Sequence, residues 1–394
     1  MFYKKITLKA KKEESIKRFH PWIFSGAIAK KEDNISEGDT VKIFSDNNDF
    51  LAIGHYQAGS IAIRIFSFED TTIDFDFWKN KIGNAYRLRE KMNFQSNGTN
   101  CYRLIHGEGD FLPGLIVDIY DNTAVIQAHS VGMHFLRNDF AKIITEIVKS
   151  VNNVYYKSNS TLSFHDKTKP EEEYLINEGT VTKLGKEYGK TFIVDWESGQ
   201  KTGYFIDQRE NRNLLGKFSN DKKILNMFCY TGGFSVSALE GGANYVVSVD
   251  SSEKAIELTK QNISTTSKVK NDNHKEIVSD AFDYLKTTEE KFDIIILDPP
   301  AYAKHRDSIH NALQAYKRIN AKALEKIESG GMLFSFSCSQ AISREQFRLA
   351  VFSAAAIAKR KVRILYQLTQ PADHPIDIYH PEGEYLKGLV LYVE

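Results

Sequence analysis

From about residue 190 to the C-terminus, apolar segments of strand length alternate with amphipathic segments of helical length. Four of the apolar segments are "KKILNMFC", "YVVSVD", "FDIIILDPP" and "MLFSFSCS". Near-continuous apolar strands are buried on both faces, and strand–helix alternation is typical of a parallel sheet covered by helices. The sequence therefore predicts a doubly wound α/β domain over residues 186–394.

The preceding 185 residues divide into two smaller units. Residues 1–72 alternate apolar and polar side chains between turn signals, which predicts a small antiparallel β-barrel. Residues 73–185 begin with a helical pattern and continue with hairpins, a second helix and a strand, so we expect a small α/β connector in the order αββαβ. The charged, turn-rich "KPEEEYLINEG" predicts a loop. A chain of 394 residues is long enough for two or three domains, and this division gives three.

Composition narrows the class of protein. With 42% hydrophobic and 26% charged residues the chain is globular. No apolar run approaches the roughly 18 residues that a membrane span needs, and the basic N-terminus lacks the apolar core of a secretory signal. Three cysteines are too few for a disulfide framework. We therefore expect a reducing, cytoplasmic location and no contact with a membrane.

The first 31 residues carry nine Lys or Arg residues against two Glu residues, although the net charge of the whole chain is +1. Such a segment is either a solvated surface or a patch that contacts phosphates, because basic clusters supply much of the affinity for nucleic acids. The 11 histidines form neither an HExxH motif nor a His/Cys cluster at ligand spacing, so we expect no metal site.

A glycine turn follows the first strand of the C-terminal half. The segment "ILNMFCYTGGFSVSALEGGANYVVSVD" has the form strand, turn, helix, strand and terminal acid. In doubly wound sheets such a turn lets the backbone approach a ligand, and the acid accepts hydrogen bonds from ribose hydroxyls. Gly232 and Gly233 fit the first role and Asp250 the second. The third glycine of the dinucleotide motif is missing, so the turn suits S-adenosylmethionine better than NAD.

Two further acids follow the next strands. Asp280 in "IVSDAF" is either an ordinary helix N-cap or the acceptor of an adenine amine. Asp298 follows the apolar run of "FDIIILDPP" and precedes Pro299 and Pro300. The two prolines fix φ, lack N–H donors and leave carbonyl groups to face a ligand. We expect the Asp298 carboxylate to face a base in the crevice of the sheet.

Cys338 in "FSFSCS" follows the strand after Asp-Pro-Pro. Taken alone it reads as a small buried hydrophobic residue, the usual role of a cysteine outside disulfides. Its place beyond the end of a parallel strand, at the same crevice as Asp298, favours a nucleophile instead. We interpret Cys229 as a packing residue and Cys101 as structural.

Together, "MFCYTGGFS", "VSVD", "VSDAF", "LDPP" and "FSFSCS" resemble successive motifs of class I methyltransferases that act on RNA. With "KTGYFIDQRENR" upstream and "HPEGEYLKGLVLYV" near the end, the chain is similar to bacterial 23S ribosomal RNA cytosine-5 methyltransferases over essentially its whole length. The resemblance implies a PUA-like RNA-binding barrel at 1–72, an α/β connector domain at 73–185 and a Rossmann-like methyltransferase domain at 186–394. It also implies S-adenosylmethionine as cofactor, ribosomal RNA as partner, and it allows a homodimer.

The resemblance assigns roles to individual residues. Cys338 and Asp298 would be catalytic. The residues that would hold the cofactor follow the strands: Phe228, Tyr230, Thr231, Gly232, Gly233, Asp250, Ser251, Asp280, Ala281, Asp298 and Pro299. The residues that would bind the RNA are Tyr204, Arg209, Pro300, Tyr302 and Lys304. Asp207 would help to order the loop beside the cofactor.

The implied chemistry is covalent. C5 of cytosine is a weak nucleophile, and a thiolate that adds to C6 gives C5 enamine character. Another group of RNA cytosine-5 methyltransferases carries a second cysteine after Asp-Pro; here that position is Pro300, so the base that removes the C5 proton is unassigned. Three alternatives stay open: methylation of an exocyclic nitrogen, of uridine C5, or RNA binding without catalysis as an assembly factor.

Overall fold

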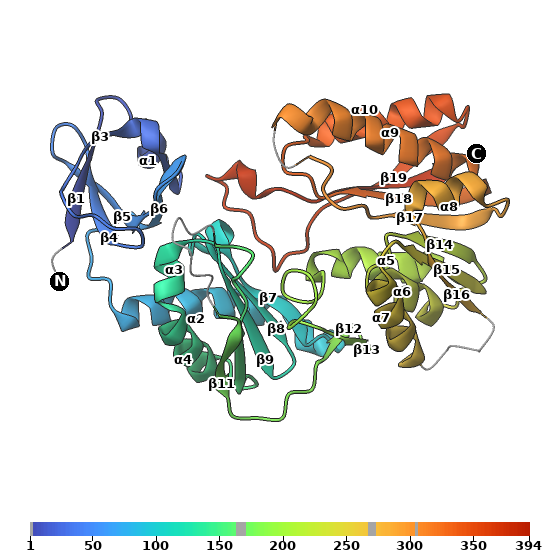
Figure 1. Cartoon of the computed structure of the whole chain (residues 1–394), viewed down its shortest axis with the longest axis horizontal. Coiled ribbons are helices and arrows are strands. Elements are labelled where there is room, and N and C mark those ends of the chain that lie inside the picture. The colour runs from blue at the N-terminus through green and yellow to red at the C-terminus, as the bar shows by residue number, and fades with distance from the viewer. Residues whose placement is uncertain (1–2, 163–170, 267–272, 304–305) are drawn as a thin grey trace. The chain divides into compact units, whose positions relative to one another are not determined.

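The structure, a computed structural model, describes residues 3–162, 171–266, 273–303 and 306–394 (Figure 1). The chain forms two compact units. The first unit consists of Met1–Lys186, Val194–Ile206 and Ala372–Gly383, and the second of Glu187–Ile193, Asp207–Pro371 and Glu384–Glu394. Two segments of the C-terminal half thus belong to the first unit. The three-domain division with boundaries at residues 72 and 185 stays a prediction.

The first unit begins with a six-stranded sheet in the order β2-β6-β5-β4-β1-β3. Its elements are β1 (Lys4–Leu8), α1 (Glu14–Lys17), β2 (Trp22–Phe24), η1 (Ser25–Ala27), β3 (Ile28–Lys31), β4 (Thr40–Phe44), β5 (Phe50–Tyr56) and β6 (Ile61–Ser67). All pairs are antiparallel except β1 with β4, which is parallel. Alternating apolar residues such as Ile6, Val41 and Ile63 point into its core, as the period-two pattern predicts.

The rest of the first unit holds a five-stranded sheet in the order β11-β10-β9-β8-β7, on which helices α2 and α4 pack. Its elements are α2 (Phe75–Met92), η2 (Phe94–Asn97), β7 (Cys101–His106), η3 (Gly107–Asp110), β8 (Leu115–Tyr120), β9 (Thr123–Ala128), α3 (Val131–Phe135), α4 (Arg137–Ile147), β10 (Asn153–Tyr156) and β11 (Glu173–Asn177). The predicted order αββαβ is therefore too short: three strands lie between the helices, and two follow them.

The predicted loop at "KPEEEYLINEG" is wrong where it overlaps β11. This charged strand pairs antiparallel with β10, and the rings of Tyr155 and Tyr174 lie 4.9 Å apart. Its own residues look like a loop because the strand lies at the sheet edge and none of its side chains is fully buried. The neighbouring strand, rather than local composition, makes it extended.

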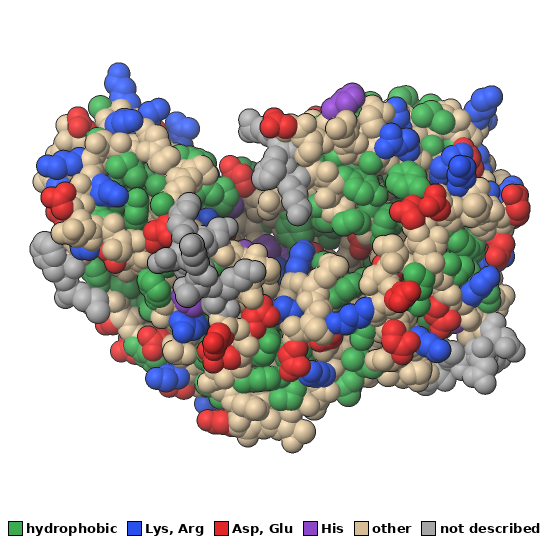
Figure 2. Space-filling model, in the orientation of Figure 1, with side chains coloured by type: hydrophobic (Ala, Val, Ile, Leu, Met, Phe, Trp, Pro, Cys, Tyr) green, Lys and Arg blue, Asp and Glu red, His purple; other side chains and the backbone are tan. Residues whose placement is uncertain are grey.

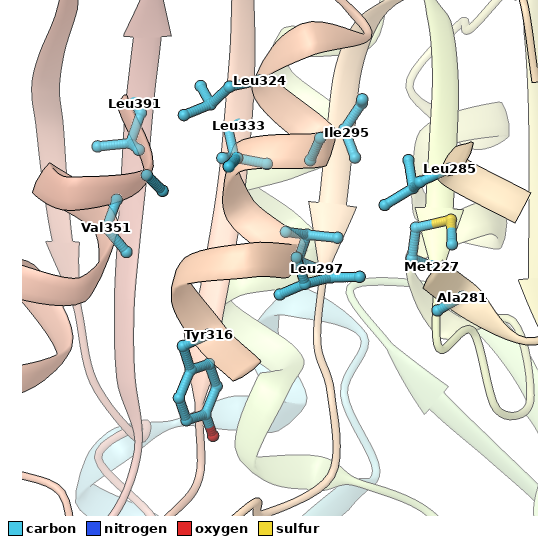
Figure 3. Packing of buried hydrophobic residues seen from close by; sticks show 14 of the residues in the cluster. Met227, Ala281, Leu285, Ile295, Leu297, Tyr316, Leu324, Leu333, Val351 and Leu391 are labelled. Atoms are coloured by element: carbon cyan, nitrogen blue, oxygen red, sulfur yellow. The ribbon is translucent and has the colours of Figure 1, made fainter. Parts of the chain in front are cut away.

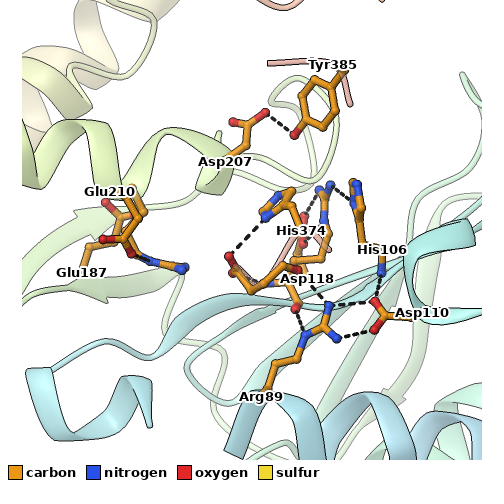
Figure 4. A network of polar contacts seen from close by, with 12 residues as sticks. Arg89, His106, Asp110, Asp118, Glu187, Asp207, Glu210, His374 and Tyr385 are labelled. Carbon is orange, nitrogen blue, oxygen red and sulfur yellow. Dashed lines mark hydrogen bonds and ion pairs between the residues drawn. The ribbon is translucent and has the colours of Figure 1, made fainter. Parts of the chain in front are cut away.

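Charged side chains are buried beneath this sheet (Figure 4). Arg89 of α2 pairs with both carboxylate oxygens of Asp110, and both side chains are about 1–2% exposed. Arg89 also donates to the carbonyl oxygens of Arg103 and Asp373, each at 2.8 Å. The Asp373 carboxylate accepts from the backbone N–H of Arg103 at 2.9 Å. Hydrogen bonds from the Arg89 side chain and the Arg103 backbone to Asp373 thus anchor the segment Ala372–Gly383 within the first unit.

The second unit is built on a seven-stranded sheet in the order β16-β15-β14-β17-β18-β20-β19. Its elements are α5 (Arg209–Phe218), β14 (Lys223–Met227), α6 (Gly233–Glu240), β15 (Tyr245–Asp250), α7 (Glu253–Ser264), β16 (His274–Val278), α8 (Ala281–Thr287), β17 (Phe292–Leu297), η5 (Arg306–Ser308), α9 (Ile309–Glu325), β18 (Ile327–Ser337), α10 (Arg344–Ile357), β19 (Val362–Leu368) and β20 (Lys387–Val393). β14 to β18 are parallel and β20 is antiparallel to both its neighbours. The predicted Rossmann-like sheet is confirmed.

Three short elements lie where the chain changes unit. They are β12 (Leu184–Glu187), β13 (Lys190–Ile193) and η4 (Ile206–Gln208), and a last short helix, η6 (Pro381–Gly383), precedes β20. β12 and β13 pair as a two-stranded sheet. None of the described helices combines the length and the apolar character needed to cross a bilayer.

One hydrophobic core of the second unit lies between the sheet and helices α8, α9 and α10 (Figure 3). Leu297, Leu333 and Leu391 project from three neighbouring strands toward Leu324 and Val351 of the helices. Burial of each such side chain contributes about 1.5–3 kcal/mol to folding. This core holds the strands in register, so that their ends present the adjoining turn residues at fixed positions.

Candidate active site

The segments that carry most of the predicted site residues lie at one edge of the sheet in the second unit. Five strands are parallel, so their carboxyl ends meet there. Met227 at the end of β14 pairs with Leu297 at the end of β17, which pairs with Ser335 of β18. The chain leaves β14 toward β15 and β17 toward β18, in opposite directions. The glycine turn and the Asp-Pro-Pro turn therefore flank the switch point, where open α/β sheets bind ligands.

The glycine turn after β14 is held in an uncommon backbone conformation. Phe228, Tyr230 and Gly232 have φ angles of +57°, +48° and +77°. Helix α7 fixes the turn, since Thr259 Oγ1 donates to the Tyr230 carbonyl at 2.8 Å and Asn262 Nδ2 donates to the Thr231 carbonyl at 2.8 Å. A Cβ atom on Gly232 would lie 2.7 Å from Thr259 Cγ2. Glycine is therefore required there by both conformation and space.

Asp250 ties this turn to the end of β15. Its Oδ2 accepts from the backbone N–H of Tyr230 at 3.0 Å and its Oδ1 from that of Ser252 at 3.0 Å. Each carboxylate oxygen has a second lone pair, so Asp250 can also accept from a ligand hydroxyl. Asp280 is the N-cap of α8, as one of its two interpretations predicts, and its Oδ1 accepts from the N–H of Phe282 at 2.8 Å. Its side chain is exposed and can accept an amine as well.

The other predicted cofactor residues lie in the same turns. Ser251 is exposed between the end of β15 and the start of α7, whereas Ala281 and Gly233 are buried first residues of α8 and α6. Thr231 is buried in the glycine turn. The structure thus brings the predicted cofactor residues to one edge of one sheet, and their contact with a cofactor stays a prediction.

Cys338 lies against the Asp-Pro-Pro turn. Cys338 directly follows β18, which ends at Ser337. Its Sγ is 3.8 Å from the carbonyl oxygen of Pro299, the residue after Asp298. Pro299 is buried, while Asp298 and Cys338 are partly exposed. Cys338 therefore contacts the direct chain neighbour of Asp298, and both predicted catalytic residues are accessible to solvent.

The two serines beside Cys338 hold its backbone. Ser339 Oγ accepts from the N–H of Ala303 at 3.2 Å and is 3.1 Å from the Tyr316 hydroxyl. Ser337 and Ser339 are fully buried, so Cys338 is the only partly exposed residue of the three. The other cysteines differ: Cys101 is buried, and burial raises the pKa of the Cys229 thiol to about 12. Among the three cysteines, only Cys338 is partly exposed.

The residues predicted to bind RNA belong to different units and differ in exposure. The ring of Tyr302 is tilted by 55° against that of Tyr316, with the centroids 4.8 Å apart, and burial raises the pKa of Tyr302. Pro300 is exposed beside it, and Lys304 lies outside the described residues. Arg209 begins α5 in the second unit and is 1% exposed, whereas Tyr204 is a buried residue of the first unit. Neither of the last two side chains presents a surface for an RNA base.

Three residues that the sequence did not single out also build the site. Thr259 and Asn262 of α7 hold the glycine turn, and Lys387 of β20 donates from Nζ to the Ser339 carbonyl at 2.6 Å. Polar residues at helical spacing on α7 look like an exposed face in the sequence. Lys387 reads as the solvated start of an apolar strand, and only the pairing of β20 with β18 places it next to Cys338.

The first unit carries a separate aromatic surface, which we call the barrel patch: Phe19, Trp22, Phe24, Tyr379 and His380. Phe19, Phe24 and Tyr379 are 47%, 50% and 48% exposed. The rings of Phe19 and Tyr379 lie 5.3 Å apart, and those of Trp22 and His380 lie 4.3 Å apart. Exposed basic residues lie nearby in the chain, and Figure 2 shows Lys and Arg side chains on the surface of the barrel.

Replacing Gly232 with alanine is expected to weaken binding of S-adenosylmethionine about 10-fold or more, because the added Cβ must displace Thr259 and with it the glycine turn. Isothermal titration calorimetry measures the affinity. Gly26→Ala is the matched control, since a Cβ there meets nothing within 4 Å. Equal affinities of the two variants would contradict a cofactor-binding role for the turn.

Two family models match the chain. Residues 6–68 match a PUA-like domain, and residues 160–379 match an S-adenosylmethionine-dependent methyltransferase. The PUA-like match begins within β1 and includes the other five strands of the first sheet, and the methyltransferase match includes the segments with Asp250, Asp298 and Cys338.

The chain is also similar along its whole length to curated proteins. It is 36% identical over 393 residues to ribosomal RNA large subunit methyltransferase I of Alteromonas mediterranea, covering 98% of both chains. It is 36% identical over 401 residues to the protein of the same name from Escherichia coli, covering 99% of both.

Solved structures share the fold. A Streptococcus mutans protein assigned as a SAM-dependent methyltransferase superposes with a TM-score of 0.84 at 22% identity, covering 99% of this chain and 100% of that one. A second structure, assigned as a methyltransferase and solved in complex with SAH, gives a TM-score of 0.83 at 22% identity with the same coverage. The combination of the N-terminal barrel with the parallel sheet therefore also occurs in solved structures.

Proposed function

The chain belongs to the family of PUA-containing, S-adenosylmethionine-dependent methyltransferases that includes ribosomal RNA large subunit methyltransferase I, and we propose that it methylates C5 of a cytosine in 23S ribosomal RNA through a covalent Cys338–C6 adduct. The observation that carries the covalent step is the position of Cys338. Its thiol is partly exposed at the sheet edge and lies 3.8 Å from the Pro299 carbonyl, beside Asp298.

The glycine turn and the acids fit S-adenosylmethionine. The turn offers backbone and carries no basic side chain that would pair with a pyrophosphate, while Asp250 and Asp280 offer carboxylate oxygens to ribose hydroxyls and an adenine amine. When bound, S-adenosylmethionine supplies an electrophilic methyl group on a sulfonium. Phe228, Tyr230, Pro299 and the neighbouring turn residues would line the same site.

Cys338 makes the target carbon reactive. Its thiolate adds to C6 of the cytosine, a bond from sulfur to carbon forms, and the electron pair displaced from the C5–C6 double bond makes C5 nucleophilic. Once C5 carries the methyl group, loss of the C5 proton restores the double bond and returns the sulfur electron pair to Cys338. Because C6 is not reachable inside a base stack, the nucleotide must be flipped out.

Asp298 would select cytosine. A carboxylate accepts a hydrogen bond from the N4 amine of cytosine, whereas uracil presents only an acceptor at the same position. Asp298 directly precedes the proline whose carbonyl touches Cys338, so one turn would hold the base edge and the nucleophile at a fixed separation. This arrangement favours cytosine-5 over uridine-5 methylation.

Trapping the adduct tests the proposal. 5-Fluorocytosine blocks loss of the substituent at C5, so the covalent complex accumulates. We expect wild-type protein, S-adenosylmethionine and 23S ribosomal RNA containing 5-fluorocytosine to give a complex stable to denaturation, and Cys338→Ala to give none. Methyl transfer that survives in Cys338→Ala would instead favour an exocyclic nitrogen, and a lack of cofactor binding would favour a non-catalytic RNA-binding protein.

The barrel patch is proposed to stack an unpaired RNA base. Exposed aromatic rings among basic residues combine stacking with phosphate contacts. We expect Phe19→Ala and Phe24→Ala each to weaken RNA binding about 5- to 100-fold, in line with the cost of losing one stacked base. Filter binding measures this, with Phe135→Ala as control because Phe135 is an exposed ring outside the patch. Equal effects in all three variants would count against the patch.

A homodimer is the remaining part of the proposal. α10 and the edge strand β19 expose apolar side chains, among them Leu349, Phe352 and Leu365, and such edges and patches favour association. Light scattering should give twice the mass of one 44.9 kDa chain for the wild type, and a lower mass for Phe352→Glu. A wild-type mass of a single chain at micromolar concentration would rule this surface out as a dimer interface.

A further inference from the structure

Lys387 is a buried lysine beside the proposed nucleophile. It is the first residue of β20, pairs with Ser337 of β18 and is 3% exposed. Its Nζ donates to the carbonyl oxygen of Ser339 at 2.6 Å, so the ammonium contacts the residue that follows Cys338, just beyond the end of β18. Strand pairing and this hydrogen bond thus hold the Lys387 ammonium at the turn that carries Cys338.

The ammonium has no close carboxylate partner among the described residues. The charges that act on it are that of the Cys338 sulfur in its thiolate form, which favours the protonated amine, and the ion pair of Glu384 with Arg344 of α10, whose two members act in opposite directions. The Tyr316 hydroxyl of α9 also faces this turn through Ser339. Burial is the largest influence and lowers the pKa of Lys387 to about 8.

A buried lysine of this kind costs stability unless it finds an anion. Taking an ammonium out of water is unfavourable, and one carbonyl offsets only part of that cost. Because the nearby Glu384 carboxylate is already paired with Arg344, the sulfur of Cys338 is the other group near Lys387 that can carry a compensating negative charge. Because β18 pairs with β20 at Ser337 and Lys387, the fold itself holds Cys338 close to Lys387.

We propose that Lys387 is a positioning residue that holds Cys338 as a thiolate, before it attacks the base and again when it is expelled. The proposal deepens the proposed function and rests on it. Cys338 loses its proton to solvent, and Lys387 stays protonated throughout. When the bond between sulfur and C6 breaks, the electron pair returns to a sulfur that still faces the ammonium, so the same charge lowers the energy of both states.

Alkylation of Cys338 by iodoacetamide tests this without RNA or a methyl donor. Because only the thiolate reacts, the rate plotted against pH reports the thiolate fraction. With peptide-resolved mass spectrometry we expect Lys387→Met to move the midpoint up by about one to two pH units and to slow alkylation about 10-fold at pH 7. Lys387→Arg should keep most of the wild-type profile, because it keeps the charge.

Lys326→Met is the matched control. Lys326 lies just before the other end of β18, and its Nζ donates to a backbone carbonyl, that of Thr288, at 2.6 Å. Its variant should leave the midpoint unchanged. Thermal unfolding of each variant shows whether the fold is retained, and if Lys387→Met is unfolded, the comparison of Lys387→Arg with Lys387→Gln replaces it.

The outcomes separate the two proposals. An unchanged alkylation profile in folded Lys387→Met would overturn the role of Lys387, even if Cys338 still forms the adduct with 5-fluorocytosine. A shifted profile without any adduct in the wild type would support the pairing of Lys387 with Cys338 and reject the covalent function. In steady-state kinetics, the role predicts a raised pH optimum of kcat in Lys387→Met with KM for RNA unchanged.

Discussion

Replacing Cys338 with alanine should lower kcat for methyl transfer to 23S ribosomal RNA on the order of 10³-fold or more, because C5 then lacks the electron density that addition at C6 provides. The affinity for S-adenosylmethionine should stay within about 2-fold, since the glycine turn is held by α7 and Asp250 and not by Cys338. Transfer of radiolabelled methyl groups measures the first quantity, and calorimetry the second.

Cys101→Ala is the control for this prediction. Cys101 is a fully buried thiol of β7 in the first unit, so its loss should change stability and leave kcat unchanged. If Cys338→Ala retained kcat within about 10-fold of the wild type, the thiol would have no role in the reaction. The carboxylate of Asp298 and the glycine turn would then have to act on a more nucleophilic atom, such as an exocyclic amine.

The strands of the second unit and the turns at their carboxyl ends could be predicted from local patterns. Near-continuous apolar runs such as "FDIIIL" are typical of strands that are covered on both faces. The sequence pattern therefore predicts the sheet, the helices that cover it and the turns between them. Parallel pairing then places the residues after each strand at one edge. Asp250, Asp280, Asp298 and Cys338 are the residues located in this way.

Features that depend on pairing between distant segments could not be predicted. The contact of Cys338 with Pro299 requires the register of β17 against β18, and the position of Lys387 requires that of β18 against β20. The same reason explains β11, whose charged residues become a strand only because β10 offers an edge.

The segment from Lys201 to Arg212 shows a different limit. The family resemblance implies that it forms one loop and helix start beside the cofactor, yet the chain changes unit within it, and Tyr204 and Arg209 are both buried. A motif that is continuous in the sequence does not indicate which of two cores its side chains enter. The segment Ala372–Gly383 is the second example, because it belongs to the first unit through contacts with β7 and α2.

The second large effect is expected at the buried pair that anchors this segment. Arg89→Met should lower the free energy of unfolding by about 3–5 kcal/mol, since it leaves the Asp110 carboxylate buried without its partner. The carbonyl oxygens of Arg103 and Asp373 also lose a donor. Urea unfolding followed by circular dichroism measures the loss, and Figure 4 shows the contacts concerned.

The double variant Arg89→Met/Asp110→Leu separates charge from packing. Removing both members takes away the unpaired carboxylate, so we expect it to recover at least half of the stability lost in Arg89→Met. The recovery should be incomplete, because Oδ2 of Asp110 also accepts from the N–H of His106 at 2.6 Å and the Asp373 carbonyl still lacks its donor. Lys79→Met, which removes an exposed ion pair with Glu146, should leave the unfolding midpoint unchanged. A double variant as unstable as Arg89→Met would show that the hydrogen bonds to Arg103 and Asp373, and not the buried charge, hold the segment Ala372–Gly383.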